Sequence, residues 1–224
     1  MEKFYLYDNE STDDTTELLA PYIKSGIVEY TYFPGLKRQL PAYGDCLEKR
    51  KVESKWIAFI DLDEFLFPVQ DDNITDWLKT IPDGTSQILV HWHMFGSSGH
   101  EKRPDGPVLE NYKFRGHNIY SKGHQKSILN PRMVLEPGVH YFRTVQNTVD
   151  ESGRTIRRKG YELPSNRIRI NHYHCKSWED YQARNARGCV FFGVPNYSLE
   201  GFKKHDHNDI YDYSAERFVK KLKK

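Results

Sequence analysis

Three carboxylates follow directly on a run of apolar residues. The run is Trp56–Ile60, and the carboxylates are Asp61, Asp63 and Glu64. Because alternate side chains of an extended chain point the same way, Asp61 and Asp63 are predicted to lie on one side of the backbone. Two such carboxylates either share a proton or hold a hard divalent cation, since Mg²⁺ and Mn²⁺ prefer oxygen ligands. The alternative interpretation is a polar strand end with solvated acids.

The elements around this run predict an α/β sheet. Lys3–Tyr7 and Ile27–Phe33 are strand-like, and apolar residues recur at helical spacing between them. This order indicates a βαβ unit with parallel strands. A helix over Leu40–Lys55 precedes the Trp56–Ile60 strand, so a doubly wound or similar three-layer sheet is the predicted fold. Ligands of such sheets bind at the carboxyl ends of strands, where the three carboxylates fall.

The later elements are predicted to be short. Strands are expected over Ser86–Phe95, Val108–Phe114, Lys126–Leu129, Gly138–Phe142 and Arg167–Ile170, and helices over Asn73–Ile81, Trp178–Arg187 and the tail Ser214–Lys224. The alternation in Ser86–Phe95 puts His91 and His93 on one face, which we interpret as a polar face rather than a metal site.

Two segments in this half are predicted to carry function. The Gly- and Pro-rich segment from Gly96 to Pro107 is expected to be a long flexible loop with an acceptor-binding or lid role. Ser177–Asp180 has the pattern of a capping box. The positive end of the helix that follows, with Lys176 beside it, is predicted to face a phosphate.

Composition excludes several classes. A chain of 224 residues suits one domain, and 33 basic against 31 acidic residues leave a net charge of +2, which disfavours general nucleic-acid binding. Three widely separated cysteines predict reduced thiols and exclude a zinc ribbon. No apolar run approaches the ~18 residues of a membrane span, and the N-terminus has no apolar leader. The expected location is therefore cytoplasmic.

A set of motifs in fixed order resembles a known family. The motifs are Y-D-N-x-S-x-D at Tyr7–Asp13, A-Y-x-x-C at Ala42–Cys46, W-I-A-F-I-D-L-D-E-F-L at Trp56–Leu66, M-F-G-S-S-G-H at Met94–His100, R-P-x-G at Arg103–Gly106, I-N-H-Y-x-x-K-S at Ile170–Ser177 and R-G at Arg187-Gly188. Together, over about residues 3–190, they resemble the family 92 glycosyltransferases and bacterial relatives related to family 2.

The resemblance implies a GT-A fold, a three-layer α/β/α sandwich with a mostly parallel central sheet, in a single domain over residues 1–224. It implies a nucleotide-sugar donor, expected to be a UDP-sugar, a Mn²⁺ or Mg²⁺ ion held by the D-x-D motif, and transfer to a saccharide acceptor with inversion. Relatives usually carry an earlier strand and helix that contact the nucleotide base, whereas this sequence starts at the Y-D-N strand.

Metal and phosphate roles then fall on five residues. We expect Asp63 to be the principal ligand of the cation, Asp61 to contact the metal or the ribose, and His172 to complete the coordination. Lys126 and Lys176 would offset the remaining phosphate charge.

Inverting transfer also needs a carboxylate base, for which Glu64 and Glu110 are the candidates. Asp8 and Asn9 are expected to hydrogen-bond the ribose or base, or simply to form a turn. Three further residues form a candidate acceptor platform: Trp92, Phe95 and His100.

Two rival functions remain open at this point. A metal-dependent phosphohydrolase would use Asp61, Asp63 and the histidines without an acceptor sugar. A saccharide-binding module would keep the fold without turnover.

Overall fold

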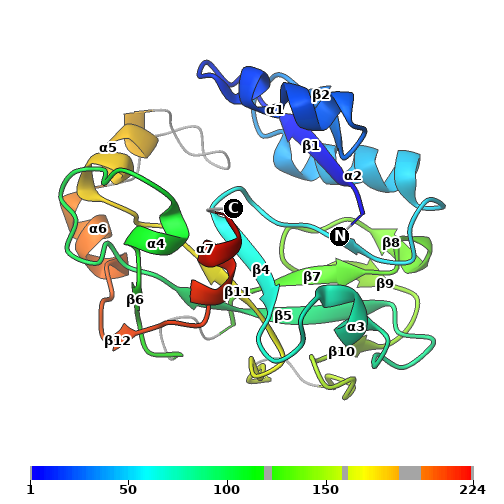
Figure 1. Cartoon of the computed structure of the whole chain (residues 1–224). Helices are drawn as coiled ribbons and strands as arrows, with labels where there is room; N and C mark the ends of the chain where they lie inside the picture. Colours follow the sequence, from blue (N-terminus) through cyan, green and yellow to red (C-terminus); the bar gives the residue numbers. More distant parts are fainter. Residues whose placement is uncertain (1, 119–122, 158–160, 187–197, 223–224) are drawn as a thin grey trace.

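A six-stranded sheet lies at the centre of the computed structural model, which describes all residues except 1, 119–122, 158–160, 187–197 and 223–224 (Figure 1). Five strands follow one another across the sheet in the order β3 (Ile57–Ala58), β7 (Gln125–Leu129), β5 (Gln87–Met94), β11 (Ile168–His172) and β4 (Glu64–Pro68). A sixth, β10 (Thr148–Val149), pairs with the start of β5.

The sheet is mixed, so the prediction of a mostly parallel central sheet is wrong. The pairs β3–β7, β5–β7 and β4–β11 are antiparallel, whereas β5–β11 and β5–β10 are parallel. The prediction of a parallel sheet rested on the family resemblance and on the βαβ pattern of the N-terminal part. That pattern forms, but in a separate two-stranded sheet.

This separate N-terminal sheet contains β1 (Phe4–Asp8) and β2 (Val28–Tyr32), which pair in parallel through α1 (Thr15–Lys24). Among the described residues, no main-chain hydrogen bond joins it to the six-stranded sheet. The following helix, α2 (Gln39–Arg50), packs between the two sheets with Cys46 and Leu47 buried.

The main core lies on one face of the six-stranded sheet, under α3 (Ile74–Leu78). Trp77 on α3 is fully buried there, and Asn73 caps the helix by accepting from the Asp76 amide. The sheet contributes its apolar alternate residues, which are Leu66, Ile88, Val90, Trp92, Ile128, Ile168 and Ile170. The predicted alternation of β5 is thus confirmed. His91 and His93, on the opposite face, are also buried.

A second cluster of aromatic residues covers part of the opposite face. It contains Phe67, Phe95, Tyr112 and Tyr173, and the helices α4 (Val108–Asn111) and α7 (Glu216–Leu222) pack together beside it. The remaining elements are β6 (Phe114–Arg115), η2 (Pro131–Met133), β8 (Val134–Glu136), β9 (Arg143–Thr144), α5 (Trp178–Ala186), α6 (Leu199–His205) and β12 (Ile210–Tyr211).

Several predicted boundaries differ. The strand expected over Val108–Phe114 begins instead as α4, because Pro107 and the Asp105 turn place a helix start there. Gly138–Phe142 has no strand pairing. Arg187, the predicted end of α5, lies outside the described residues. No helix in the described ranges is long and apolar enough to cross a membrane.

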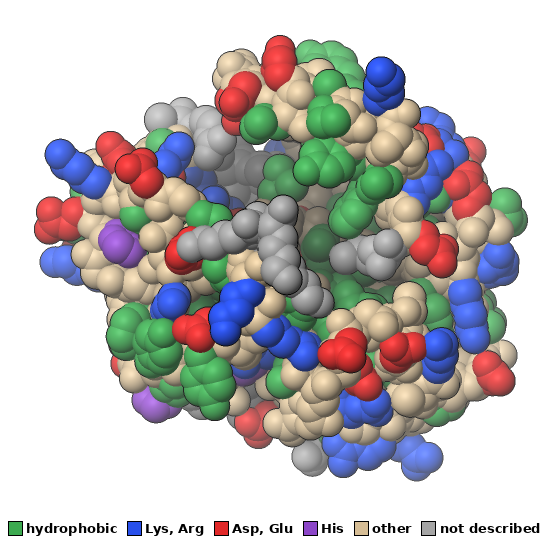
Figure 2. All heavy atoms as spheres, viewed as in Figure 1, with side chains coloured by type: hydrophobic (Ala, Val, Ile, Leu, Met, Phe, Trp, Pro, Cys, Tyr) green, Lys and Arg blue, Asp and Glu red, His purple; other side chains and the backbone are tan. Residues whose placement is uncertain are grey.

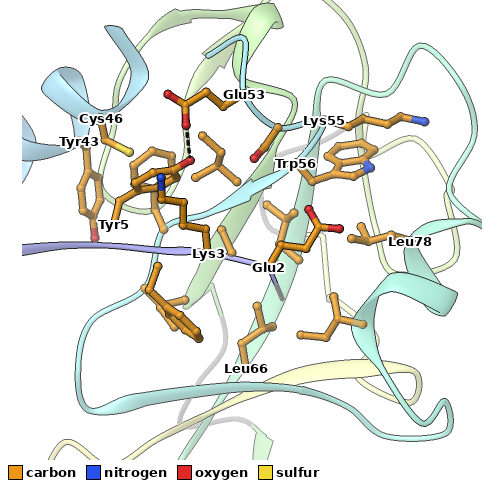
Figure 3. A pocket seen from close by; sticks show the side chains of 18 of the residues that line it. Glu2, Lys3, Tyr5, Tyr43, Cys46, Glu53, Lys55, Trp56, Leu66 and Leu78 are labelled. Atoms are coloured by element: carbon orange, nitrogen blue, oxygen red, sulfur yellow. Dashed lines mark hydrogen bonds between the residues drawn. The ribbon is translucent and has the colours of Figure 1, made fainter. Parts of the chain in front are cut away.

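A cavity of about 410 Å³ separates β1 from the six-stranded sheet. It is lined by β1, by α2, by residues 54–60 around β3 and by α3 (Figure 3). Figure 2 shows apolar side chains around the hollow below the N-terminal elements. Tyr43 of α2 and Ile60 lie in its wall, next to the first of the three carboxylates.

Candidate functional site

The three carboxylates lie in and after a turn rather than on one continuous strand. β3 ends at Ala58 and β4 begins at Glu64, and the Glu64 amide donates to the Asp61 carbonyl at 3.0 Å. The alternation rule therefore does not apply between Asp61 and Asp63. Their carboxylates join two different clusters of side chains, which corrects the prediction that they share one side of the backbone.

The Asp61 carboxylate is held by three donors from two elements. Gln39 Nε2 donates to Oδ1 at 2.6 Å, and the Tyr43 hydroxyl donates to the same oxygen at 3.2 Å. Lys126 Nζ of β7 donates to Oδ2 at 3.0 Å. The side chain of Asp61 is 35% exposed, so it forms the accessible part of this cluster.

Beneath Asp61, Glu64 and Lys126 are almost fully enclosed. Glu64 Oε2 accepts from the Asp61 amide at 3.0 Å, and Oε1 lies 3.7 Å from Lys126 Nζ. Burial raises the pKa of Glu64 to about 8, although the nearby Lys126 charge opposes that shift. A carboxyl group in this position supports the turn from below. Glu110, the other predicted base, lies on α4.

The second cluster contains Asp63, His172 and His174. Asp63 Oδ2 lies 3.5 Å from His172 Nε2, and the two histidine rings are 5.6 Å apart between centroids. Burial alone would raise the pKa of Asp63, but the hydrogen bond to His172 and the charge of Arg184 hold it well below its usual range. Burial, helped by Arg184, lowers the pKa of His174 to about 3, so its ring is neutral near pH 7.

This cluster fits a divalent cation. The three side chains each offer one ligand atom, and these atoms lie within 4.8 Å of one another. His172 Nδ1 is buried without a hydrogen-bond partner in the described part of the chain. One carboxylate and two imidazoles suit Mn²⁺ better than Mg²⁺, because Mg²⁺ favours oxygen ligands in an octahedral shell.

The structure thus brings together Asp63 and His172, as expected, and adds His174 and Arg184. Asp61 stands apart, with Lys126 against it. The sequence did contain a signal for His174, since it lies two residues after His172. Arg184 carried no signal, because it approaches Asp63 across 121 residues of chain from α5.

Asp8 and Asn9 form local contacts at the end of β1. The Asp8 carboxylate accepts from the Ser11 amide at 2.9 Å and from the Tyr30 hydroxyl. Asn9 Nδ2 donates to the carbonyls of Phe33 and Gly35, at 3.1 and 2.9 Å. Both residues therefore stabilise the chain at the ends of β1 and β2, in agreement with the turn-forming role that was the alternative to nucleotide binding. Contact with a nucleotide stays a prediction.

The start of α5 was predicted to bind a phosphate, but its first amide groups have partners within the protein. The predicted capping box is confirmed in part: Ser177 Oγ accepts from the Asp180 amide at 3.1 Å, but the Ser177 amide donates to the Tyr112 hydroxyl rather than to the Asp180 side chain. The Trp178 and Glu179 amides donate to the carbonyls of His100 and Glu101, at 3.2 and 3.0 Å. The protein itself thus satisfies the first donors of this helix. Lys176, just before it, has a left-handed backbone with φ 51°.

The segment beginning at Gly96 is anchored to the C-terminal part of the chain. Ser97 donates to the Asp206 carboxylate from its amide at 2.5 Å and from its hydroxyl at 3.0 Å. The Ser98 amide donates to Asn208 Oδ1 at 2.7 Å. The prediction of a freely flexible loop is therefore wrong at this end of the segment.

The three predicted platform residues have different surroundings. Phe95 is 1% exposed and packs on Tyr173, so it belongs to the aromatic core. His100 packs on Tyr112. Trp92 is the one beside the site, with its ring centroid 4.4 Å from that of His172.

Comparison with known proteins identifies the family. The model of glycosyltransferase family 92 matches residues 1–218. A family 92 protein of Oryza sativa subsp. japonica is 26% identical over 190 residues, which are 81% of this chain and 30% of the relative. A galactan beta-1,4-galactosyltransferase of Arabidopsis thaliana is 25% identical over 186 residues, 76% of this chain and 33% of the relative.

A mixed α/β sheet with acidic and histidine side chains gathered at strand ends is the framework of this protein. The chain belongs to glycosyltransferase family 92. It spans about a third of the length of the curated relatives that it matches.

Proposed function

We propose that this chain carries the catalytic centre of a cation-dependent glycosyltransferase. The enzyme transfers a hexose from a UDP-sugar to a saccharide acceptor, with inversion at the anomeric carbon. The observation that carries the proposal is the cluster of Asp63, His172 and His174 at the ends of adjacent elements. The GT-A arrangement is part of the proposal, and the βαβ unit of β1 and β2 supports it.

Asp63, His172 and His174 would hold the ion, expected to be Mn²⁺. A bound ion would supply Lewis-acid neutralisation of the departing diphosphate. Asp63 is ionised and His174 neutral near pH 7, so both are ready to bind without gaining or losing a proton. The remaining steps rest on the chain's own side chains.

Asp61 is the accessible acid beside this cluster, and we propose that it contacts the ribose or the ion. Lys126 and Glu64 hold it in place from below, through the 3.0 Å contact of Lys126 with the carboxylate and that of Glu64 with the amide. Glu64 is thereby a positioning residue, because its side chain is fully buried. Glu110 then remains the candidate base for the acceptor hydroxyl.

The donor and acceptor classes come from the relatives. Because some of them are galactan beta-1,4-galactosyltransferases, UDP-galactose with β-1,4-galactan oligosaccharides is the first pair to test. UDP release is measured in Mn²⁺ with and without the acceptor, followed by a panel of other UDP-hexoses and saccharides. Release that depends on an acceptor, with a lengthened saccharide by mass spectrometry, is the expected result.

The two rival functions give different results in this assay. Cleavage of simple phosphoesters without an acceptor would indicate a phosphohydrolase, and saccharide binding without release would indicate a binding module. Asp63→Asn should abolish release, whereas Asp83→Asn should not, since Asp83 is fully exposed. Equal activity of wild type and Asp63→Asn would refute the assignment of this site.

A further inference from the structure

The guanidinium of Arg184 contacts two of the side chains that a cation would use. Its NH1 donates to Asp63 Oδ2 at 2.9 Å, to His174 Nδ1 at 3.3 Å and to the His174 carbonyl at 3.2 Å. Two of the three proposed ligand side chains are therefore already engaged by one positive group. In the structure, the positive charge of Arg184 therefore balances the negative charge of Asp63, as the charge of a bound ion would.

Arg184 and a divalent cation cannot both hold this position. The Asp63 oxygen that accepts from Arg184 is the one nearest to His172, so the same atom faces both uses. Two positive groups at hydrogen-bond distance in a largely buried cluster would also repel each other strongly. One of them must move when the other binds.

The arginine is the group that can move. Its side chain is 34% exposed, whereas that of Asp63 is 15% exposed and that of His172 is 8% exposed. Its side chain is long, and a planar guanidinium pairs well with phosphate oxygens. The diphosphate that accompanies the cation is a natural second partner.

We propose that Arg184 is a switching residue, which competes with the divalent cation for Asp63 and His174 and moves to the diphosphate once the cation binds. This inference rests on the proposed cation site. It gives Arg184 two opposite effects: the guanidinium weakens the binding of the cation and strengthens the binding of the diphosphate. A purely structural arginine would not have that signature.

Calorimetry tests the two effects separately on the whole chain. MnCl₂ is titrated into wild type and Arg184→Ala, and UDP is then titrated into each at saturating Mn²⁺. Loss of one charge-assisted hydrogen bond predicts about tenfold tighter Mn²⁺ binding by the variant. By the same measure, UDP binding should be about tenfold weaker. Arg143→Ala is the control, because Arg143 pairs with Glu136 on the exposed surface, and it should change neither affinity.

The possible failures are distinguishable. Mn²⁺ affinity that is unchanged or lower in Arg184→Ala would overturn the competition, even where Asp63→Ala abolishes Mn²⁺ binding and so upholds the cation site. Tighter Mn²⁺ binding with unchanged UDP affinity would overturn the transfer of the guanidinium to the anion. No Mn²⁺ binding by either protein would overturn the cation site itself. Circular dichroism of each variant checks that it is folded.

Discussion

Replacing Lys126 with methionine tests whether the buried ion cluster under Asp61 stabilises the fold. Methionine keeps most of the length and the apolar contacts of lysine but removes the charge. Lys126 is 1% exposed, and its ammonium lies 3.0 Å from Asp61 and 3.7 Å from Glu64. The substitution leaves Glu64, whose side chain is fully buried, without an opposite charge.

At pH 9, above the pKa of about 8 that burial gives Glu64, this carboxylate is ionised, and the expected loss is about 3 kcal/mol of the free energy of unfolding, the lower end of the range for breaking a buried ion pair. The lower end applies because Asp61 keeps its hydrogen bonds from Gln39 and Tyr43 and is 35% exposed, so water solvates it. The two buried groups, Glu64 and Lys126, account for most of the cost.

Urea unfolding at pH 9, followed by circular dichroism, measures this loss. Lys55→Met is the matched control, since Lys55 has an exposed side chain near Asp83, and it should change the free energy by less than about 0.5 kcal/mol. Adding Glu64→Gln to Lys126→Met should recover part of the loss, because a neutral pair replaces a lone charge. A loss below about 1 kcal/mol for Lys126→Met would refute the reasoning, as would a double variant less stable than the single one.

Three further predictions concern the fold around the site. Ser177→Ala removes the cap of α5 and should cost about 1 kcal/mol in urea unfolding, and no measurable cost would contradict the capping role. Burial lowers the pKa of His91 to about 4 and that of His93 to about 2, so the unfolded chain takes up more protons below pH 6.5. Stability should therefore fall as pH drops from 6.5 toward 4, by up to about 1.4 kcal/mol per pH unit per histidine, and His91→Gln should flatten this slope. Gly96→Ala places a methyl group 2.5 Å from two oxygens and should cost about 1–3 kcal/mol, whereas Gly44→Ala, with no atom nearer than 4.0 Å, should not destabilise the protein.

Local patterns in the sequence were sufficient to predict many of the helices and strands. The alternation in β5 identified its core face, and the Ser177 pattern identified the start of α5, because both signals depend on neighbouring residues. The pairing directions of the six-stranded sheet were not predictable in this way. They depend on how distant strands such as β4 and β11 meet, which no local period encodes.

The site shows the same division. Asp63 and His172 were predicted and lie together, because Asp63 directly precedes β4, His172 ends β11, and the antiparallel pairing of these strands sets His172 opposite Glu64. The separation of Asp61 from Asp63 was missed, since one turn within the motif reverses the alternation on which the prediction relied. Arg184 was missed because it reaches the site from a helix far along the chain.

The division of the strands into two sheets has a mechanical consequence. The N-terminal layer contacts the rest of the described protein through side chains such as Tyr43, whose ring lies 4.6 Å from that of Phe59. Sliding or lifting this layer would therefore break ring contacts and side-chain hydrogen bonds, but no ladder between strands. Because α2 carries both Gln39 and Tyr43, any such displacement would pull two of the three donors off Asp61. The acid thus keeps all three donors only while the two layers stay docked, and Lys126 alone would remain after they part.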